Sequence, residues 1–192
     1  MALRFVSLCL TVAMLLVFDA SAQTSKSPDR QYQEVDWVAL MPKDDLDTLL
    51  DPPDYFADIA DGSQEDSLEA LTQQAQQDEK VRRYQDALTS TRVVQDWHNK
   101  AIKIPGFIVP LQADEQQHVT EFFIVPYFGA CLHMPPPPPN QIIYAVLKKG
   151  VELKNLYDPF WFEGLLAIEI NENEMGTAAY RLWIDSVVPY ED

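Results

Sequence analysis

The chain has 192 residues, with 14 Lys and Arg against 30 Asp and Glu, so its formal net charge is −16 at pH 7. This charge argues against DNA, RNA and anionic lipid surfaces as partners, because each would be repelled. It fits a protein with a solvated acidic surface or one that attracts cations.

Residues 1–22 have the pattern of a secretory signal peptide. Arg4 gives a positive start, residues 5–18 are an apolar run, and residues 20–22 are Ala-Ser-Ala, small residues suited to a cleavage site. The apolar run is shorter than the ~20 residues that a transmembrane helix needs, so we expect cleavage before Gln23 and no membrane span afterwards. Lipoprotein processing at Cys9 is not expected, because the residue before it is not small.

Cleavage leaves about 170 residues, enough for one domain with an extension. Cys131 is then the one remaining cysteine, because Cys9 is removed with the signal peptide. An intramolecular disulfide is therefore impossible. The alternatives for Cys131 are burial, metal binding, a reactive thiol or an intermolecular bridge.

Residues 23–35 are polar and lack periodicity, which predicts a disordered leader. Residues 36–42 contain the first apolar cluster. Its Trp37 and Leu40 fall on one helical face, and Pro42 ends the turn. We expect Trp37 to pack back onto the main domain.

Residues 36–90 as a whole predict an acidic, partly helical extension. Within it, residues 64–88 are rich in Gln and Ala and carry apolar residues at helical spacing. This pattern predicts one surface helix, with Ser63 as its N-cap.

Residues 91–192 predict a β domain. Gly106 and Gly164 near strand middles would permit tight coiling, and no helical pattern separates the strands. The fold class expected is therefore mostly β, a small antiparallel OB-like barrel over residues ~90–190. Its expected strands, the first two forming a hairpin around residues 98–100, are 91–97, 101–111, 119–127, 141–147, 160–170 and 178–188.

The segment at residues 128–141 combines a Cys-x-His pair with a proline run. Five prolines favour a rigid polyproline II strut that cannot join a sheet interior because it has no N–H donors. Such a strut would hold the residues before it in a fixed place. The prolines are Pro135, Pro136, Pro137, Pro138 and Pro139.

Cys131 and His133 are two residues apart, so on an extended chain both side chains point the same way. They could be two ligands of zinc or copper. Alternatively, His133 could activate the Cys131 thiol as a nucleophile, or both could be buried for structure. Candidate completing ligands are His98, His118, Glu121, Met134 and Asp185.

These residues resemble a known family. The run FGACLHMPPPPPNQ at residues 128–141, with IPGFIVPL at 104–111 and FWFEGLL at 160–166, is similar to a family of uncharacterised exported proteins of Gram-negative bacteria, a domain of unknown function. The Asp-Trp-x-x-Leu-x-Pro element at residues 36–42 adds to the resemblance. It implies a periplasmic or envelope protein, in the company of envelope ABC-transporter components and metal homeostasis. Many relatives look like lipoproteins, whereas this chain lacks a lipobox.

Three functions follow as hypotheses. The first is a periplasmic, non-enzymatic accessory protein that binds a transition metal, with zinc as the first candidate, through Cys131 and His133 and cooperates with an envelope transporter. The alternative is a protein–protein interaction module, and the minor alternative is a thiol enzyme. In the interaction module the docking surface would comprise Tyr127, Phe128, Met134, Pro135, Pro136, Pro137, Pro138, Pro139, Asn140 and Gln141.

Overall fold

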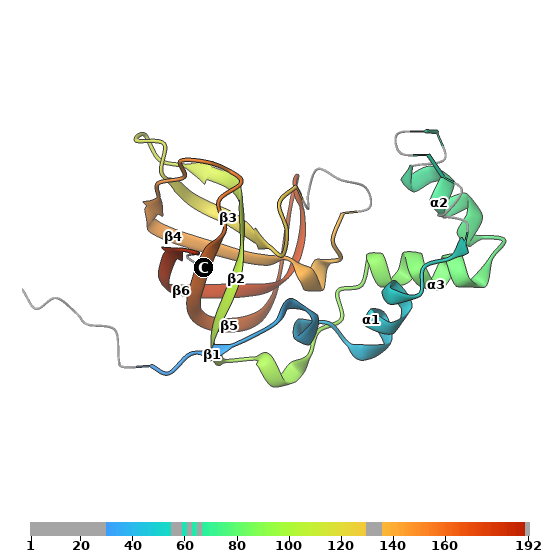
Figure 1. Ribbon diagram of the computed structural model, residues 1–192, viewed down its shortest axis with the longest axis horizontal. Coiled ribbons are helices and arrows are strands. Elements are labelled where there is room, and N and C mark those ends of the chain that lie inside the picture. The colour runs from blue at the N-terminus through green and yellow to red at the C-terminus, as the bar shows by residue number, and fades with distance from the viewer. Residues whose placement is uncertain (1–29, 55–58, 61–62, 65–66, 130–135, 191–192) are drawn as a thin grey trace, which may run out of the picture.

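The computed structural model describes residues 30–54, 59–60, 63–64, 67–129 and 136–190. A barrel of strands and a helical arm to one side of it make up this part of the chain (Figure 1). The strands are β1 (Gln33–Glu34), β2 (Lys100–Ala113), β3 (Val119–Val125), β4 (Ile143–Val151), β5 (Phe160–Asn173) and β6 (Gly176–Pro189). The helices are η1 (Trp37–Leu40), α1 (Lys43–Leu50), α2 (Leu68–Ala75), α3 (Glu79–Leu88), η3 (Gln95–Trp97) and η4 (Pro139–Gln141), where η marks a 3₁₀ helix.

The strand order is β1-β2-β3-β4-β6-β5, and β2 also pairs with β5, which closes strands β2 to β6 into a five-stranded barrel. The pairs β2–β3, β3–β4, β2–β5 and β5–β6 are antiparallel. Strands β4 and β6 pair in parallel, with Ile143 opposite Tyr180. The prediction of a mostly β, OB-like barrel is confirmed, although the barrel is not antiparallel throughout.

Strand β2 pairs with two neighbouring strands. Its first half pairs with β5 as far as Gly106, and its second half pairs with β3 from Phe107 onward. A Cβ at Gly106 would lie 2.8 Å from Ile124 Cγ2, and a Cβ at Gly164 would overlap the Trp183 carbonyl. Both glycines therefore permit the close strand approach that tight coiling requires.

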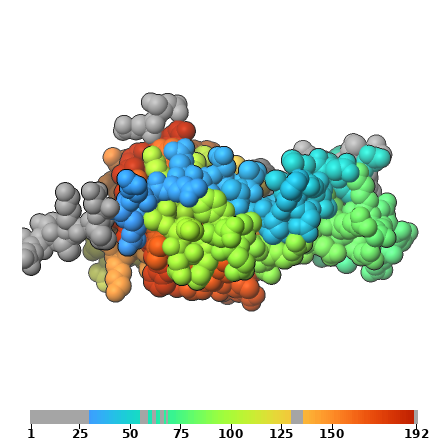
Figure 2. All heavy atoms as spheres, turned by 90° about the horizontal axis from the view of Figure 1, so that it is seen from below, coloured from blue at the N-terminus to red at the C-terminus, as the bar shows by residue number. Residues whose placement is uncertain are grey.

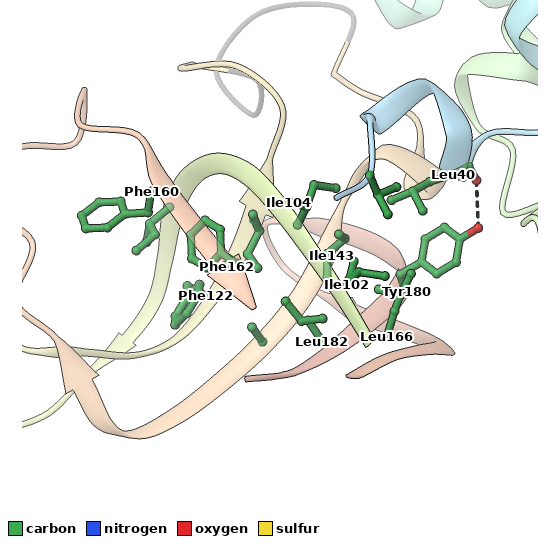
Figure 3. Close-up of a cluster of buried hydrophobic side chains, with 14 of the residues drawn as sticks. Leu40, Ile102, Ile104, Phe122, Ile143, Phe160, Phe162, Leu166, Tyr180 and Leu182 are labelled. Atoms are coloured by element: carbon green, nitrogen blue, oxygen red, sulfur yellow. Dashed lines mark hydrogen bonds between the residues drawn. The ribbon is translucent and has the colours of Figure 1, made fainter. Parts of the chain in front are cut away.

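The barrel interior is filled by large apolar side chains from all five strands. Figure 3 shows this core extending from Phe160 at one end to Tyr180 and Leu40 at the other. Burial of each such side chain stabilises the fold by roughly 1.5–3 kcal/mol relative to exposure. The fully buried members include Ile102, Ile104, Phe122, Ile124, Ile143, Phe162, Leu166 and Leu182.

The end of the barrel near Tyr180 is closed by η1. The Tyr180 hydroxyl donates to the Leu40 carbonyl at 2.8 Å and accepts from the Val94 N–H at 2.9 Å. Trp97 Nε1 donates to the Ala39 carbonyl at 2.8 Å. Burial raises the pKa of Tyr180 to about 12, against a smaller opposing effect of the Val94 hydrogen bond.

Trp37 anchors η1 to the barrel wall. Its Nε1 donates to the Pro105 carbonyl at 2.7 Å, and its ring lies near Gly106. The prediction that Trp37 packs back onto the main domain is confirmed. We call η1 with Tyr180 and Trp97 the η1 cap.

The helical arm consists of α1, α2 and α3 and projects from the barrel (Figure 2). The predicted single helix over residues 64–88 is wrong, because Asp78 starts a second helix by accepting from the Lys80 and Val81 N–H groups. The first helix begins at Ser67, whose hydroxyl accepts from the Ala70 N–H, and not at Ser63. Leu71, Ala75 and Val81 form the arm's own small core, against which Leu88 packs.

Arg92 joins the arm to the barrel. Its guanidinium donates to Asp44 at 2.6 Å and to Asp45 at 3.1 Å in α1. Ser90 donates to the buried Asp45 at 2.6 Å. The hydrogen bond from Arg92 lowers the pKa of the Asp44 carboxyl.

Two further expectations differ from the structure. Residues 91–97 are not a strand; their aromatic and apolar residues pack beside η1 and end in η3. Residues 30–35 depart from the predicted disordered leader, since β1 pairs in parallel with β2 and Val35 is buried. Across the described ranges, no helix has the length and apolar character needed to span a membrane.

Candidate functional site

The predicted metal ligands Cys131 and His133, with Met134 and Pro135, lie outside the described residues, so their predicted roles stay predictions. The structure instead defines the two flanks of this segment. One flank ends at Gly129 and the other begins at Pro136.

The downstream flank is held inside the protein. Pro137 and Pro138 are buried, and Asn140 and Gln141 in η4 are buried as well. Asn140 Nδ2 donates to the Arg92 carbonyl at 3.0 Å. These four members of the predicted docking surface are therefore not exposed on the described surface.

Gln141 ties this flank to the η1 cap. Its Nε2 donates to the Trp37 carbonyl at 2.9 Å and to the Asn140 carbonyl at 3.1 Å. Two of the sequence elements that carry the family resemblance thus meet in space, residues 36–42 and the end of residues 128–141. Pro136 and Pro139 are partly exposed beside them.

The upstream flank is held by aromatic contacts. The Phe128 ring lies 4.0 Å from the Tyr157 ring and 6.4 Å from the Phe107 ring, measured between centroids. Gly129 follows with φ +76°, a conformation that favours glycine. Tyr127 is exposed next to these rings.

Beside Phe128 the structure has an apolar pocket of about 200 Å³, which we call the Phe128 pocket. The second half of β2, the end of β3, the loop before β5 and the tip of the β5–β6 hairpin all contribute to it. The lining residues are Phe107, Ile108, Val109, Pro110, Val125, Phe128, Gly129, Leu156 and Met175.

The apolar floor of this pocket follows from the pattern of β2 and β3. Phe123 and Val125 point to the outside of the barrel, yet both are fully buried. Phe107, Val109 and Leu111 of β2 pack against them. The continuous run from Phe122 to Val125 is thus typical of a strand buried on both faces.

Large apolar side chains that line the pocket, or adjoin Phe128 in sequence or by ring contact, are exposed. Tyr127 is 47% exposed, Leu156 48%, Tyr157 64% and Met175 50%. An apolar patch gathered around one pocket marks an interaction site more strongly than scattered apolar residues do. Aromatic residues and methionine are also enriched at protein interfaces.

The predicted completing ligands have other partners. His98 Nδ1 accepts from the Ile168 N–H at 3.1 Å, and His118 Nδ1 lies 3.4 Å from Asp114 Oδ2. Asp185 accepts from Arg30 at 2.8 Å and from Tyr32 at 3.0 Å. Within the described ranges, no group of three or more His, Cys, Asp or Glu is placed to hold a metal ion.

Glu121, another predicted completing ligand, has a hydrogen-bond partner in Tyr144. Burial, followed by a hydrogen bond to Glu121, raises the pKa of Tyr144 on β4.

Leu156 and Met175 are pocket residues that sequence reasoning missed. Both lie in segments whose composition otherwise predicts polar turns. A large apolar residue in a predicted turn could have pointed to these two pocket residues, because turn positions are usually polar or glycine. Phe107 was predicted to lie in a strand, but nothing in the sequence around it indicated that its side chain faces out of the barrel.

Comparisons with known proteins identify related chains. The family model described as "Protein of unknown function (DUF3299)" matches residues 37–189. The crystal structure of a DUF3299 family protein from Pseudomonas aeruginosa PAO1 is similar, at 36% sequence identity and a TM-score of 0.61, covering 84% of this chain and 98% of that chain. A comparison with curated proteins gives no match.

Proposed function

Because this chain belongs to the DUF3299 family, which is described as being of unknown function, we propose a function from the chain's own geometry. The protein is a non-catalytic binding module that takes an apolar side chain of a partner protein into the Phe128 pocket. The observation that supports this proposal is the 200 Å³ apolar pocket lined by exposed Leu156 and Met175, with the ring of exposed Tyr157 against its Phe128 ring.

The size of the pocket selects the kind of occupant. Sites for drug-sized ligands and cofactors usually have volumes of about 300–1,000 Å³. The Phe128 pocket is smaller and has almost no polar lining, so it offers little to orient a cofactor. A single apolar anchor of a protein segment, such as a Leu or Phe side chain, suits it better.

The negative charge around the pocket indicates a partner segment with positive charge. Asp158 follows Tyr157, Glu174 precedes Met175, and both carboxylates are exposed. The whole chain carries a net charge of −16. A partner segment with Lys or Arg beside its apolar anchor would therefore be steered to this rim.

We place this interaction in the periplasm, with an envelope ABC-transporter component or another periplasmic protein as the partner. The signal peptide pattern of residues 1–22 and the family resemblance support that placement.

The test is a selection of displayed random peptides on the purified protein. We expect enrichment of peptides with one apolar anchor flanked by Lys or Arg. Leu156→Glu and Met175→Glu, each at an exposed position, should weaken binding of a selected peptide by tenfold or more. Leu50→Glu, on the exposed face of α1, is the matched control and should leave binding unchanged. Equal binding by all three variants would contradict the proposal.

A second candidate function is zinc binding through Cys131 and His133. Its support is that both flanks of their segment are held, by the Phe128 ring contacts on one side and by buried Pro137 and Asn140 on the other. Fixed flanks lower the entropy that a loop loses on binding. Metal content of protein purified without chelator or affinity histidines tests it: near-stoichiometric zinc, lost in a Cys131→Ala, His133→Ala double variant, is expected. A metal-free protein that also refuses added zinc would rule the hypothesis out.

A further inference from the structure

The end of the barrel opposite the η1 cap is open. A pocket of about 480 Å³ lies there, between the end of β4, the loop before β5 and the end of β6. We call it the barrel-mouth pocket. Its lining residues are Leu147, Lys149, Gly150, Val151, Glu152, Lys154, Asp158, Pro159, Phe160, Val187, Pro189 and Tyr190.

The floor of this pocket is one end of the barrel core. Val151 and Phe160 belong to the core cluster, and Leu147 and Val187 pack against it. A ligand in the pocket would therefore contact the apolar interior of the barrel directly. Barrel mouths are among the usual places for small-molecule sites, and this volume falls within the usual range of about 300–1,000 Å³.

A large bulge in β4 shapes the rim. Val119 pairs with Val151 and Glu121 pairs with Val146, so a single residue of β3 lies opposite residues 147–150 of β4. Gly150 has φ +66°, and a Cβ there would overlap the His118 side chain. Bulges at barrel rims redirect side chains toward functional sites, and this one sets Leu147 and Lys149 along the pocket.

Lysines without a partner beside the pocket indicate the charge of the group that would bind there. Among the described residues, eight of the Lys and Arg side chains have an ion pair or an aromatic ring contact. The described cations without either are Lys100, Lys148, Lys149 and Lys154. Three of these four lie between residues 148 and 154, where Lys149 and Lys154 line the pocket.

Unpaired carboxylates carry no such information. With 30 acidic against 14 basic residues, most carboxylates must lack a partner, and Glu152 and Asp158 at the rim are of that kind. Most of the described cations in this acidic chain have a partner, so two unpaired ones at one pocket indicate a place for an anionic group.

From this geometry we propose that the barrel-mouth pocket binds a single-chain amphiphile with an anionic head. The apolar chain lies against Val151, Phe160 and Val187, and the head lies between Lys149 and Lys154. The net charge repels anionic membranes, but one anion contacts these lysines locally. A carboxylate and a phosphate monoester head share this chemistry.

The test titrates monomeric hexanoate, octanoate and decanoate into the protein. Each added methylene should tighten binding about fourfold, from the ~0.8 kcal/mol per buried CH₂ group. Octyl phosphate should bind as octanoate does if the pocket takes any anionic head, and more weakly if it selects carboxylates. Octylammonium and octyl glucoside should bind more weakly than both.

A Lys149→Ala, Lys154→Ala variant should weaken octanoate binding by about fivefold or more. The matched control is Lys100→Ala, Lys148→Ala, which removes the same charge from positions that do not line the pocket and should change binding less than twofold. Methyl NMR should show octanoate shifting Val151 and Val187 and leaving Leu156 and Met175 unshifted. Tighter binding of octylammonium, no chain-length dependence, or shifts confined to Leu156 and Met175 would each overturn the proposal, independently of the Phe128 pocket.

Discussion

The two ends of the barrel are finished in opposite ways. At one end the η1 cap seals the core, and the Ala39 and Leu40 carbonyls accept hydrogen bonds from Trp97 and Tyr180. At the other end Val151 and Phe160 form the floor of a pocket, and the loop at residues 152–159 lines it. Leu156 of the same loop lines the Phe128 pocket on the outside of the barrel.

We infer from this difference that one end stabilises the barrel and the other is available for binding. The η1 cap pairs its buried polar groups, as expected of a region that stabilises the fold. At the open end Leu147 and Val187 are only partly buried, so a bound apolar group would cover them further. The loop at residues 152–159 therefore contributes to both pockets. The η1 cap closes the opposite end of the barrel.

The largest expected effect comes from removing a buried side chain at the capped end of the barrel. Leu40→Ala should lower the free energy of unfolding by about 2–5 kcal/mol, because Leu40 is fully buried and its removal leaves a cavity. Leu147→Ala at the open end should cost less than half as much, because Leu147 is only partly buried. Denaturant unfolding measures both, and equal losses would break the distinction between the ends.

The next effect tests the polar closure of the cap. Tyr180→Phe should lower the free energy of unfolding by about 1–3 kcal/mol, because it leaves the Val94 N–H and the Leu40 carbonyl without their buried partner. Binding of a peptide in the Phe128 pocket should not change. A stability as high as that of the wild type would show that the cap does not depend on this hydroxyl.

A pH dependence should accompany the same side chain. The unfolded chain releases the tyrosine proton near pH 10, whereas the pKa of buried Tyr180 is about 12. The folded state therefore holds more protons than the unfolded state over this interval, and stability should fall as the pH rises from 10 to 12. Tyr180→Phe should lose less stability over this interval than the wild type does; parallel curves would contradict the assignment.

The smallest expected effect concerns the arm. Arg92→Ala should change global stability by no more than ~1 kcal/mol, because its ion pairs with Asp44 and Asp45 are partly exposed on the Arg92 side. Amide hydrogen exchange in α1 should nevertheless become faster, since the joint to the barrel is lost. Arg83→Ala, which removes an exposed ion pair within α3, is the control and should leave α1 unchanged.

The strands were predictable where apolar runs are long, as in β3 and β5. The parallel pairing of β4 with β6 was not, because a strand's sequence does not specify its neighbour's direction. Residues 91–97 read as a strand because Val93, Val94 and Trp97 are typical of one. The packing of Val93 and Trp97 against the barrel core overrides that preference.

The candidate site was predictable only in part. Of the predicted docking residues, Phe128 lines the Phe128 pocket, whereas none of the prolines in the run does. Leu156 and Met175 reach the same pocket from loops 28 and 47 residues further along the chain, a juxtaposition that only the closed barrel creates. The contact of Gln141 with η1, which lies about 100 residues earlier, likewise follows from the closed barrel.

Methionine methyl NMR tests the central claim most directly, because Met175 lines the Phe128 pocket while Met41 is buried next to η1. A saturating amount of a peptide selected for its apolar anchor and basic flanks should shift the Met175 methyl signal and leave the Met41 signal in place. An unchanged Met175 signal at saturation, or a larger shift at Met41, would contradict the Phe128 pocket as the binding site.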